Sequence, residues 1–221
     1  MTTIRVALVD DQPLFRSGLR MVIDSQDDLE VVGEAGDGRQ ALGMVTQTRP
    51  DVVLMDIRMP VSDGIEATEQ IMARAAESGT EPPRILVLTT FDLDEGAARA
   101  IRAGASGFVL KDAEPEFLLA AIRTVHSGTA VIAPAATREL FEHFGFGGKP
   151  RDNGVALSGL SDREREIFLL AARGLSNGEI ARNEFVSEAT VKTHISRILA
   201  KLGLRDRVQL VVFAHERRLL G

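Results

Sequence analysis

The stretch Ile4–Asp24, IRVALVDDQPLFRSGLRMVID, sets the pattern for the first part of this 221-residue chain. It begins with a short run of apolar and β-branched residues, continues with two aspartates, and ends in a segment with helical spacing of its apolar residues. The run is continuously apolar rather than alternating, as expected for a strand in a parallel sheet that is covered on both faces. Further copies of this strand–helix pattern would therefore indicate an α/β domain.

Such copies recur throughout residues 1–128. Apolar runs predict strands at Ile4–Val9, Leu29–Ala35, Val52–Met55, Ile85–Leu88 and Gly107–Leu110. Segments with helical spacing predict helices at about 13–25, 37–48, 63–77, 92–103 and 114–127. Five strands alternating with five helices predict a doubly wound, five-stranded parallel sheet of the flavodoxin-like type.

The composition excludes several classes of protein. Hydrophobic residues make up 44% of the chain and charged residues 26%, the balance of a globular protein rather than of a disordered or collagen-like one. No apolar run approaches the roughly 18–20 residues of a membrane span, and the first residues lack the pattern of a signal peptide. The absence of cysteine excludes disulfides, thiolate zinc sites and cysteine nucleophiles. We therefore expect a cytoplasmic protein with no membrane partner.

The net charge of −6 is divided unevenly along the chain. Residues 1–128 carry 12 Lys and Arg against 21 Asp and Glu, a net charge of −9, and residues 129–156 are neutral. Residues 157–221 carry 11 Lys and Arg against 8 Asp and Glu, a net charge of +3. The asymmetry indicates two domains with different partners, and the basic one is the candidate for binding a polyanion.

After residue 128 the strand–helix alternation ends. Residues 129–156 are rich in Gly, Pro and Asn toward their end and predict a linker that contains one short helix at 135–144. Residues 157–221 contain no strand-like run and predict an all-α domain of four helices. Each predicted helix start pairs a capping residue with a residue three positions on: Ser161 and Glu164, Ser176 and Glu179, Ser187 and Thr190, Asp206 and Gln209.

Polar residues follow four of the predicted strands, at the point where each strand ends. They are Asp10 and Asp11, Asp56, Thr89 and Thr90, and Lys111. If the strand order is 2-1-3-4-5, the carboxyl ends of these strands lie at one edge of the sheet, where ligands bind. Each residue alone is compatible with an ordinary turn or cap, but their conjunction at four strand ends favours a functional site.

The chemistry of such a site follows from its charges. Three carboxylates at close range repel one another and need a counter-charge, which Mg²⁺ supplies because it prefers oxygen ligands. A lysine beside Mg²⁺ stabilises charge on a phosphoryl group during transfer. A carboxylate in that setting can act as the nucleophile and become an acyl phosphate. These residues therefore predict phosphoryl chemistry with Mg²⁺ as the cofactor.

Four segments of the first part resemble the receiver domain of two-component response regulators: VALVDDQPLFRSGL, VVLMDIRMPVSDGIEA, VLTTFD and AGASGFVLKD. The resemblance covers essentially all of residues 1–128. It implies that Asp56 accepts a phosphoryl group from the phosphohistidine of a sensor histidine kinase. It also implies that Asp11 and Asp56 bind Mg²⁺ with the main-chain carbonyl of Arg58, and that Asp10 assists.

The same resemblance implies roles for three residues of the last two strands. Lys111 pairs with the phosphoryl group, Thr89 moves to bond one of its oxygens, and Phe108 turns inward to follow Thr89. From its place in an apolar strand alone, Phe108 is also compatible with a core position.

In the last part of the chain, Ser176–Glu184 and Glu188–Leu202 predict a short and a longer helix joined by a turn. The longer helix has an apolar stripe, formed by Val191, Ile195, Ile198 and Leu202. Its other side is polar and basic and carries Lys192, Thr193, Ser196, Arg197 and Lys201, with Ser187, Thr190 and Arg205 flanking it as candidates for phosphate contacts. A helix-turn-helix protein needs this arrangement to place one helix in the major groove of double-stranded DNA, although an ordinary solvated helix face has it too.

The segment LSDREREIFLLAARGLSNGEIARNEFVSEATVKTHISRILAKLGLRDRVQLV resembles the LuxR-type helix-turn-helix domain, over nearly all of residues 157–215. Together with the receiver, it makes the chain similar to the NarL/FixJ family. The resemblance implies that Lys192, Thr193 and Ser196 lie nearest the bases, that Arg197 and Lys201 lie near the backbone, and that the active form is a homodimer. One departure is Glu184, at a position where an apolar residue is common; an acid there is expected to be exposed or slightly destabilising.

These observations predict a response regulator rather than an enzyme. Phosphorylation of Asp56 would control DNA binding and transcription, and we hypothesise that the unphosphorylated receiver occludes the recognition helix. Two alternatives remain open at this point. The first is an orphan regulator that binds DNA without phosphorylation, and the second is a Mg²⁺-dependent phosphohydrolase with an aspartyl nucleophile.

Overall fold

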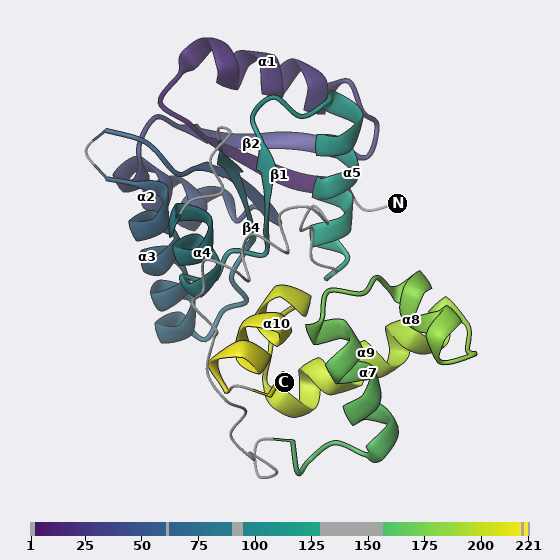
Figure 1. The fold of residues 1–221 in the computed structure, drawn as a ribbon. Coiled ribbons are helices and arrows are strands. Elements are labelled where there is room, and N and C mark those ends of the chain that lie inside the picture. The colour runs from purple at the N-terminus through teal and green to yellow at the C-terminus, as the bar shows by residue number, and fades with distance from the viewer. Residues whose placement is uncertain (1–2, 61, 90–94, 129–156, 218, 221) are drawn as a thin grey trace. The chain divides into compact units, whose positions relative to one another are not determined.

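The computed structural model describes residues 3–60, 62–89, 95–128, 157–217 and 219–220, and divides the chain into two compact units (Figure 1). The units are Met1–Ala133 and Pro134–Gly221. The predicted linker at 129–156, its short helix at 135–144 and Thr90 lie outside the described residues. Along the described part of the chain, no helix combines the length and the apolar character that crossing a membrane requires.

The first unit contains a five-stranded parallel sheet in the order β2-β1-β3-β4-β5. Its strands are β1 (Ile4–Val9), β2 (Leu29–Ala35), β3 (Val52–Asp56), β4 (Arg84–Thr89) and β5 (Gly107–Leu110). The predicted fold class and strand order are confirmed. Strand β3 extends one residue past its predicted end, so Asp56 is the last residue of the strand, and β4 is one residue longer at each end.

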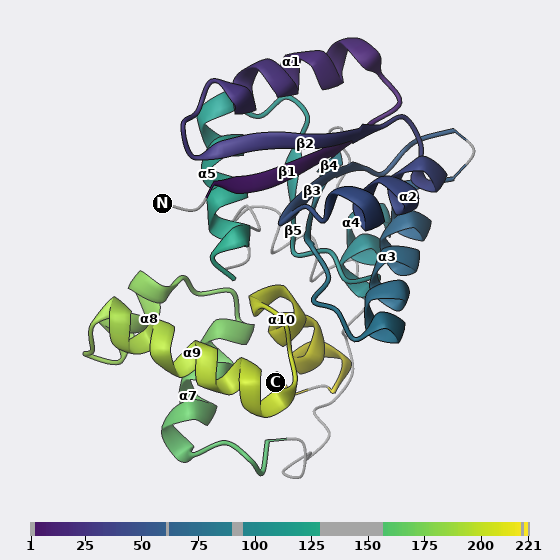
Figure 2. The ribbon, with the colours of Figure 1, turned by 180° about the vertical axis from the view of Figure 1, so that it is seen from behind.

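Helices cover both faces of this sheet, as Figures 1 and 2 show. They are α1 (Pro13–Asp24), α2 (Gly38–Thr48), α3 (Gly64–Ser78), α4 (Glu95–Arg102) and α5 (Pro115–His126). Helices α1 and α5 lie on one face, where Leu19, Ile23 and Ile122 join the strand residues in one apolar cluster. Helices α2, α3 and α4 lie on the other. All five residues of β3 are buried, as its continuous apolar run predicts.

The described residues of the second unit, 157–217 and 219–220, form α7 (Asp162–Ala172), α8 (Asn177–Asn183), α9 (Glu188–Leu202) and α10 (Arg207–Glu216). The side chains of Ser161 and Ser176 cap α7 and α8 in complete capping boxes with Glu164 and Glu179. At the other two starts, Ser187 accepts from the Thr190 amide and Asp206 accepts from the Gln209 amide, at 3.1 and 3.0 Å. The four helix starts therefore have the hydrogen bonds that the sequence predicts.

The core of this unit is built around α9. Val191, Ile195 and Ile198 of the predicted stripe are buried, but Leu202 is only partly buried. Leu199, which the sequence analysis did not include, is 9% exposed and completes the inward face. It lies four residues after Ile195, one helical turn along the same face. The outward side of α9 is thus left free of core packing.

Candidate functional site

The carboxyl edge of the sheet gathers the three predicted aspartates. Asp10 and Asp56 are 1% and 4% exposed, and Asp11 is half-buried. One carboxylate oxygen from each lies within 4.8 Å of the other two. Asp10 and Asp11 follow β1, Asp56 ends β3, and these strands are neighbours, so the strand order itself brings the acids together.

Lys111, which follows β5, binds two of these acids. Its Nζ atom lies 2.7 Å from Asp10 Oδ2 and 2.8 Å from Asp56 Oδ2. The ammonium group also lies 5.0 Å from the centre of the Phe15 ring, on the α1 side. Its side chain is only 12% exposed, so the ion pairs lie largely out of contact with water.

The remaining oxygens of Asp10 and Asp56 accept backbone hydrogen bonds. Asp10 Oδ1 accepts from the Gln12 amide at 2.9 Å, and Asp56 Oδ1 accepts from the Arg58 amide at 3.2 Å. Burial raises the pKa of Asp56 even though its hydrogen bond to Lys111 works in the opposite direction. Burial alone would lower the pKa of Lys111, but its hydrogen bonds to the two acids outweigh burial and raise it.

The donor set fits a magnesium ion. Three carboxylates face a single ammonium group, so the cluster carries excess negative charge in a mostly buried position. A hard divalent cation with oxygen ligands offsets that charge. Asp10, Asp11 and Asp56 supply carboxylate oxygens, and Arg58 lies two residues after Asp56 with its amide already fixed to that side chain.

Thr89 and Phe108 lie beside this cluster on the last two strands. Thr89 ends β4 and is 7% exposed, and its carbonyl accepts from the Lys111 amide at 2.8 Å. Phe108 is 2% exposed, so its ring points inward in this structure. The five predicted receiver side chains, Asp10, Asp11, Asp56, Thr89 and Lys111, therefore share one edge of the sheet.

Two further residues shape this edge, and the sequence analysis missed both. Arg16 of α1 donates from Nη1 to the Asp10 carbonyl at 2.5 Å and is itself held by Glu34 of β2 at 3.2 Å. Gly64 begins α3 so close to Asp56 that a Cβ atom on it would lie 1.9 Å from the Asp56 carbonyl oxygen. Both roles depend on the close approach of two elements in space, for which the sequence carries no periodic signal. The sequence predicted only that a helix begins near residue 63.

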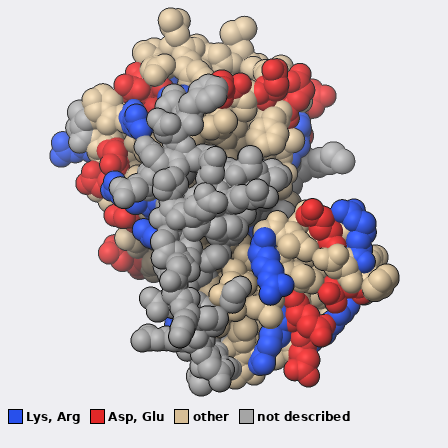
Figure 3. Space-filling model, viewed as in Figure 1, with Lys and Arg blue, Asp and Glu red and all other residues tan. Residues whose placement is uncertain are grey.

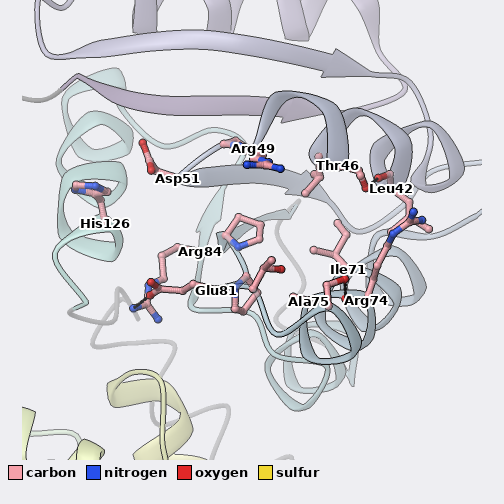
Figure 4. Close-up of a pocket in the computed structure, with 16 residues that line it drawn as sticks. Leu42, Thr46, Arg49, Asp51, Ile71, Arg74, Ala75, Glu81, Arg84 and His126 are labelled. Atoms are coloured by element: carbon pink, nitrogen blue, oxygen red, sulfur yellow. Dashed lines mark hydrogen bonds and ion pairs between the residues drawn. The ribbon is translucent and has the colours of Figure 1, made fainter.

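Figure 4 shows a groove of about 620 Å³ at the opposite end of the sheet. It is lined by residues that include Arg49, Arg74, Arg84, Asp51 and Glu81. Arg84 lies 3.7 Å from Glu81, and Asp51 Oδ2 accepts from the Arg5 amide at 2.8 Å. The groove thus has mixed charge at the amino ends of β3 and β4, and none of the predicted phosphoryl-transfer residues lines it.

The outward face of α9 carries four of the predicted DNA-contacting residues. Lys192, Thr193, Ser196 and Arg197 are all exposed. The Thr193 and Ser196 hydroxyls donate to the carbonyls four residues earlier, each at 3.0 Å. The second unit has basic and acidic side chains interspersed on the side shown in Figure 3, so its surface is not uniformly basic.

Two charged residues near α9 are ion-paired in ways that the sequence did not reveal. Lys201 Nζ lies 2.6 Å from Glu164 Oε2, which ties the end of α9 to the start of α7. Glu184 pairs with Arg163, whose Nη2 also donates to the Glu184 carbonyl at 2.9 Å. With 19% of its side chain exposed, Glu184 is partly buried and paired, so the expectation of an exposed acid is wrong, and the alternative of a slightly destabilising acid stays a prediction.

The geometry defines a class of protein. The first unit carries a lysine-bound carboxylate cluster on a sheet of order 2-1-3-4-5, and the second unit is a helix-turn-helix domain. This combination is typical of a DNA-binding response regulator. Residues 6–123 match the family model described as the response regulator receiver domain, and residues 158–214 match the model described as bacterial regulatory proteins of the luxR family. The chain belongs to the NarL/LuxR family of response regulators.

Known relatives agree over nearly the whole length. The chain is 45% identical over 212 residues to the transcriptional regulatory protein YxjL of Bacillus subtilis, covering 96% of this chain and 94% of the relative. It is 38% identical over 213 residues to the DNA-binding transcriptional activator DevR/DosR of Mycobacterium tuberculosis, with the same coverages. The crystal structure of the response regulator ChrA of a heme-sensing two-component system matches with a TM-score of 0.53 and 39% identity, covering 100% of both chains.

Proposed function

We propose that a sensor histidine kinase phosphorylates Asp56 and that this modification controls DNA binding by α9. The observation that carries the proposal is Lys111, which bridges the buried Asp10 and Asp56 beside a third carboxylate. One ammonium group leaves part of the charge of three carboxylates uncompensated. This excess of negative charge beside a lysine supports a site that receives a cation and a phosphoryl group.

The residues divide the chemistry between them. A carboxylate oxygen of Asp56 attacks the phosphorus of a phosphohistidine, the P–N bond breaks, and the histidine nitrogen keeps the bonding electrons and takes up a proton. Mg²⁺ supplies charge neutralisation when it is bound by Asp10, Asp11, Asp56 and the Arg58 carbonyl. Lys111 leaves the carboxylates for the new phosphoryl oxygens, and its charge stabilises them.

The signal then passes along the last two strands to the second unit. A phosphoryl group adds roughly −1.5 to −2 charge where it has been measured on other residues. Thr89 moves to bond one of the phosphoryl oxygens, and Phe108, whose ring already points inward at 2% exposure, follows Thr89. The outcome is a homodimer in which Lys192, Thr193 and Ser196 contact bases, and Arg197, Ser187 and Thr190 contact the backbone of double-stranded DNA.

The test is the intact mass of the chain after incubation with Mg²⁺ and a small acyl phosphate. We expect a single phosphoryl adduct that is absent from Asp56→Ala and lost when Mg²⁺ is removed. The modified chain should then bind a duplex, selected from a random-sequence pool, more tightly than the unmodified chain does. No adduct with any donor, together with unchanged DNA binding by Asp56→Ala, would contradict the proposal and leave an orphan regulator. Turnover of small phosphate esters would instead identify a phosphohydrolase.

A further inference from the structure

The turn between α8 and α9 exposes an aromatic side chain. Phe185 is 93% exposed, and among the described residues of the second unit it is the one large hydrophobic side chain that lies in solvent to this extent. Its φ angle is +55°, in the left-handed region that a bulky side chain rarely adopts. Both the exposure and the backbone conformation disfavour phenylalanine at this position.

The hydrogen bonds of the turn explain the backbone but not the side chain. Helix α8 ends with the Glu184 amide donating to Ile180 at 2.9 Å and the Val186 amide donating to Ala181 at 3.0 Å. This arrangement requires a left-handed residue at position 185, and glycine is the usual choice. Helices α3 and α9 of the same chain end with glycines in that conformation, Gly79 and Gly203. The fold itself thus gains nothing from a ring at 185.

The turn between α8 and α9 is also held by a residue of α7. Arg163 of α7 pairs with the Glu184 carboxylate and donates to its carbonyl at 2.9 Å. Phe185 therefore projects from a backbone that is bound to α7 on its N-terminal side. On its C-terminal side, Ser187 caps α9 two residues later. A rigid backbone that presents an exposed ring beside the recognition helix is suited to binding, because little conformational freedom is left to lose.

The surroundings of Phe185 indicate the kind of partner. Its exposed neighbours are polar: Arg182, Asn183, Ser187, Glu188 and Thr190. No described large apolar side chain of this unit joins it in a patch, so the surface lacks the apolar centre of a protein–protein interface. A single apolar ring beside the hydroxyls of Ser187 and Thr190 and the cation of Arg182 fits the edge of a DNA groove, where sugars and the thymine methyl are apolar and phosphates are not. The one acid in this set, Glu188, has its carboxylate next to Gly178 of α8.

We propose that Phe185 is a DNA-contacting residue, whose ring packs against the deoxyribose backbone at the groove edge when α9 lies in the major groove. This inference rests on the proposed DNA binding by α9 and assigns to the turn a contact beyond the polar residues of the helix. The contact is apolar and made to the sugars, so it strengthens binding to every duplex sequence and is insensitive to salt.

Phe185→Gly tests the inference in the full-length phosphorylated chain. Glycine suits the left-handed turn, so the midpoint of chemical unfolding should stay unchanged or rise. The affinity for a duplex selected by the wild-type chain from a random pool should fall by roughly tenfold, with an unchanged salt dependence. A merely structural Phe185 would give higher stability and unaltered DNA affinity, which would overturn the inference. Unaltered DNA affinity with reduced self-association would also overturn it, in favour of a second copy as the partner.

Arg49→Gly is the matched control. Arg49 is the other described non-glycine residue with a positive φ angle, at +46°, and it caps α2 in the receiver. The same relief of backbone strain there should leave DNA affinity unchanged.

Lys192→Ala separates this inference from the proposed function. If Lys192→Ala weakens binding and Phe185→Gly does not, only the inference fails. If the wild-type chain selects no duplex at all, DNA binding by α9 and the inference fail together.

Discussion

The acidic edge of the receiver and the outer face of α9 differ in how much of their chemistry the fold fixes. At the acidic edge, Asp10, Asp56 and Lys111 are largely buried, and the distances between them are set by the strands of one sheet. On α9, Lys192 and Arg197 are exposed, and only the helix that carries them is fixed. Buried charges must be held by partners, so their arrangement identifies chemistry, whereas exposed charges become ordered only with a ligand.

The largest expected effect tests the buried side of this comparison. Asp56→Asn should abolish the phosphoryl adduct, because the amide is not a nucleophile of carboxylate strength. Without Mg²⁺, the same variant should unfold at higher denaturant concentration than the wild type, because it removes a buried charge that faces Asp10 and Asp11. Mass spectrometry and urea titration measure the two effects. Equal or lower stability of Asp56→Asn would show that Lys111 alone compensates the acids.

The next effect concerns the backbone that carries Asp56. Gly64→Ala should lower the free energy of unfolding by about 2 kcal/mol or more, because its Cβ atom would lie 1.9 Å from the Asp56 carbonyl oxygen. Gly43→Ala is the control, since Gly43 lies inside α2 with open space around it and should gain up to about 1 kcal/mol in helix propensity. Urea titrations of both variants decide the matter. A Gly64→Ala variant as stable as the wild type would mean that α3 can shift without cost.

A smaller effect is expected from the arginine that holds the β1–α1 loop. Arg16→Met should weaken Mg²⁺ binding by roughly tenfold, as is typical when a group that orients a ligand residue is lost. The reason is the hydrogen bond from Arg16 to the Asp10 carbonyl, which belongs to the peptide group that joins Asp10 to Asp11. Arg20→Met is the control, because Arg20 binds the same Glu34 at 2.6 Å but makes its other described bond to Asp24 and not to Asp10. Mg²⁺ titration by calorimetry distinguishes them, and equal affinities would exclude a role for Arg16.

The same difference between buried and exposed groups explains what the sequence could predict. Strand order and the convergence of Asp10, Asp56 and Lys111 follow from continuous apolar runs and from the residues that end them. The helix starts at Ser161 and Ser176 follow from local spacing. The Arg16–Glu34 and Arg163–Glu184 pairs could not be predicted, because each joins residues 18 or 21 positions apart, a separation that leaves no periodic signal in the sequence. Among the described residues, the exposed Lys192 and Arg197 have no ion-pair partner, so their roles rest on the resemblance.

The smallest effect tests whether Lys201 belongs to the scaffold or to the DNA-binding face. The hydrogen bonds from Lys201 and from the Ser161 amide lower the pKa of Glu164 from 4.5 to about 2. A folded-state pKa below the unfolded value contributes stability that is fully present above about pH 4.5 and is lost as the pH falls toward 2. In the full-length chain, Glu164→Gln should therefore reduce the hydrogen-exchange protection of α7 and α9 at pH 6. The loss of protection that the wild type shows between about pH 4.5 and pH 2 should be smaller in this variant. Glu166→Gln is the control and should leave the profile unchanged, because among the described residues the exposed Glu166 side chain pairs with Arg163 alone, at 2.8 Å.

The salt dependence of DNA affinity tests whether Lys201 contacts DNA. If Lys201 contacts a phosphate, Lys201→Met lowers the slope of log affinity against log salt by about one, as Arg197→Met should. The 2.6 Å pair with Glu164 favours the other result, an unchanged slope with lower stability, because a lysine engaged by a carboxylate at the base of α7 must break that pair to reach DNA. A reduced slope for Lys201→Met at unchanged stability would place Lys201 with Lys192 and Arg197 on the DNA-binding face.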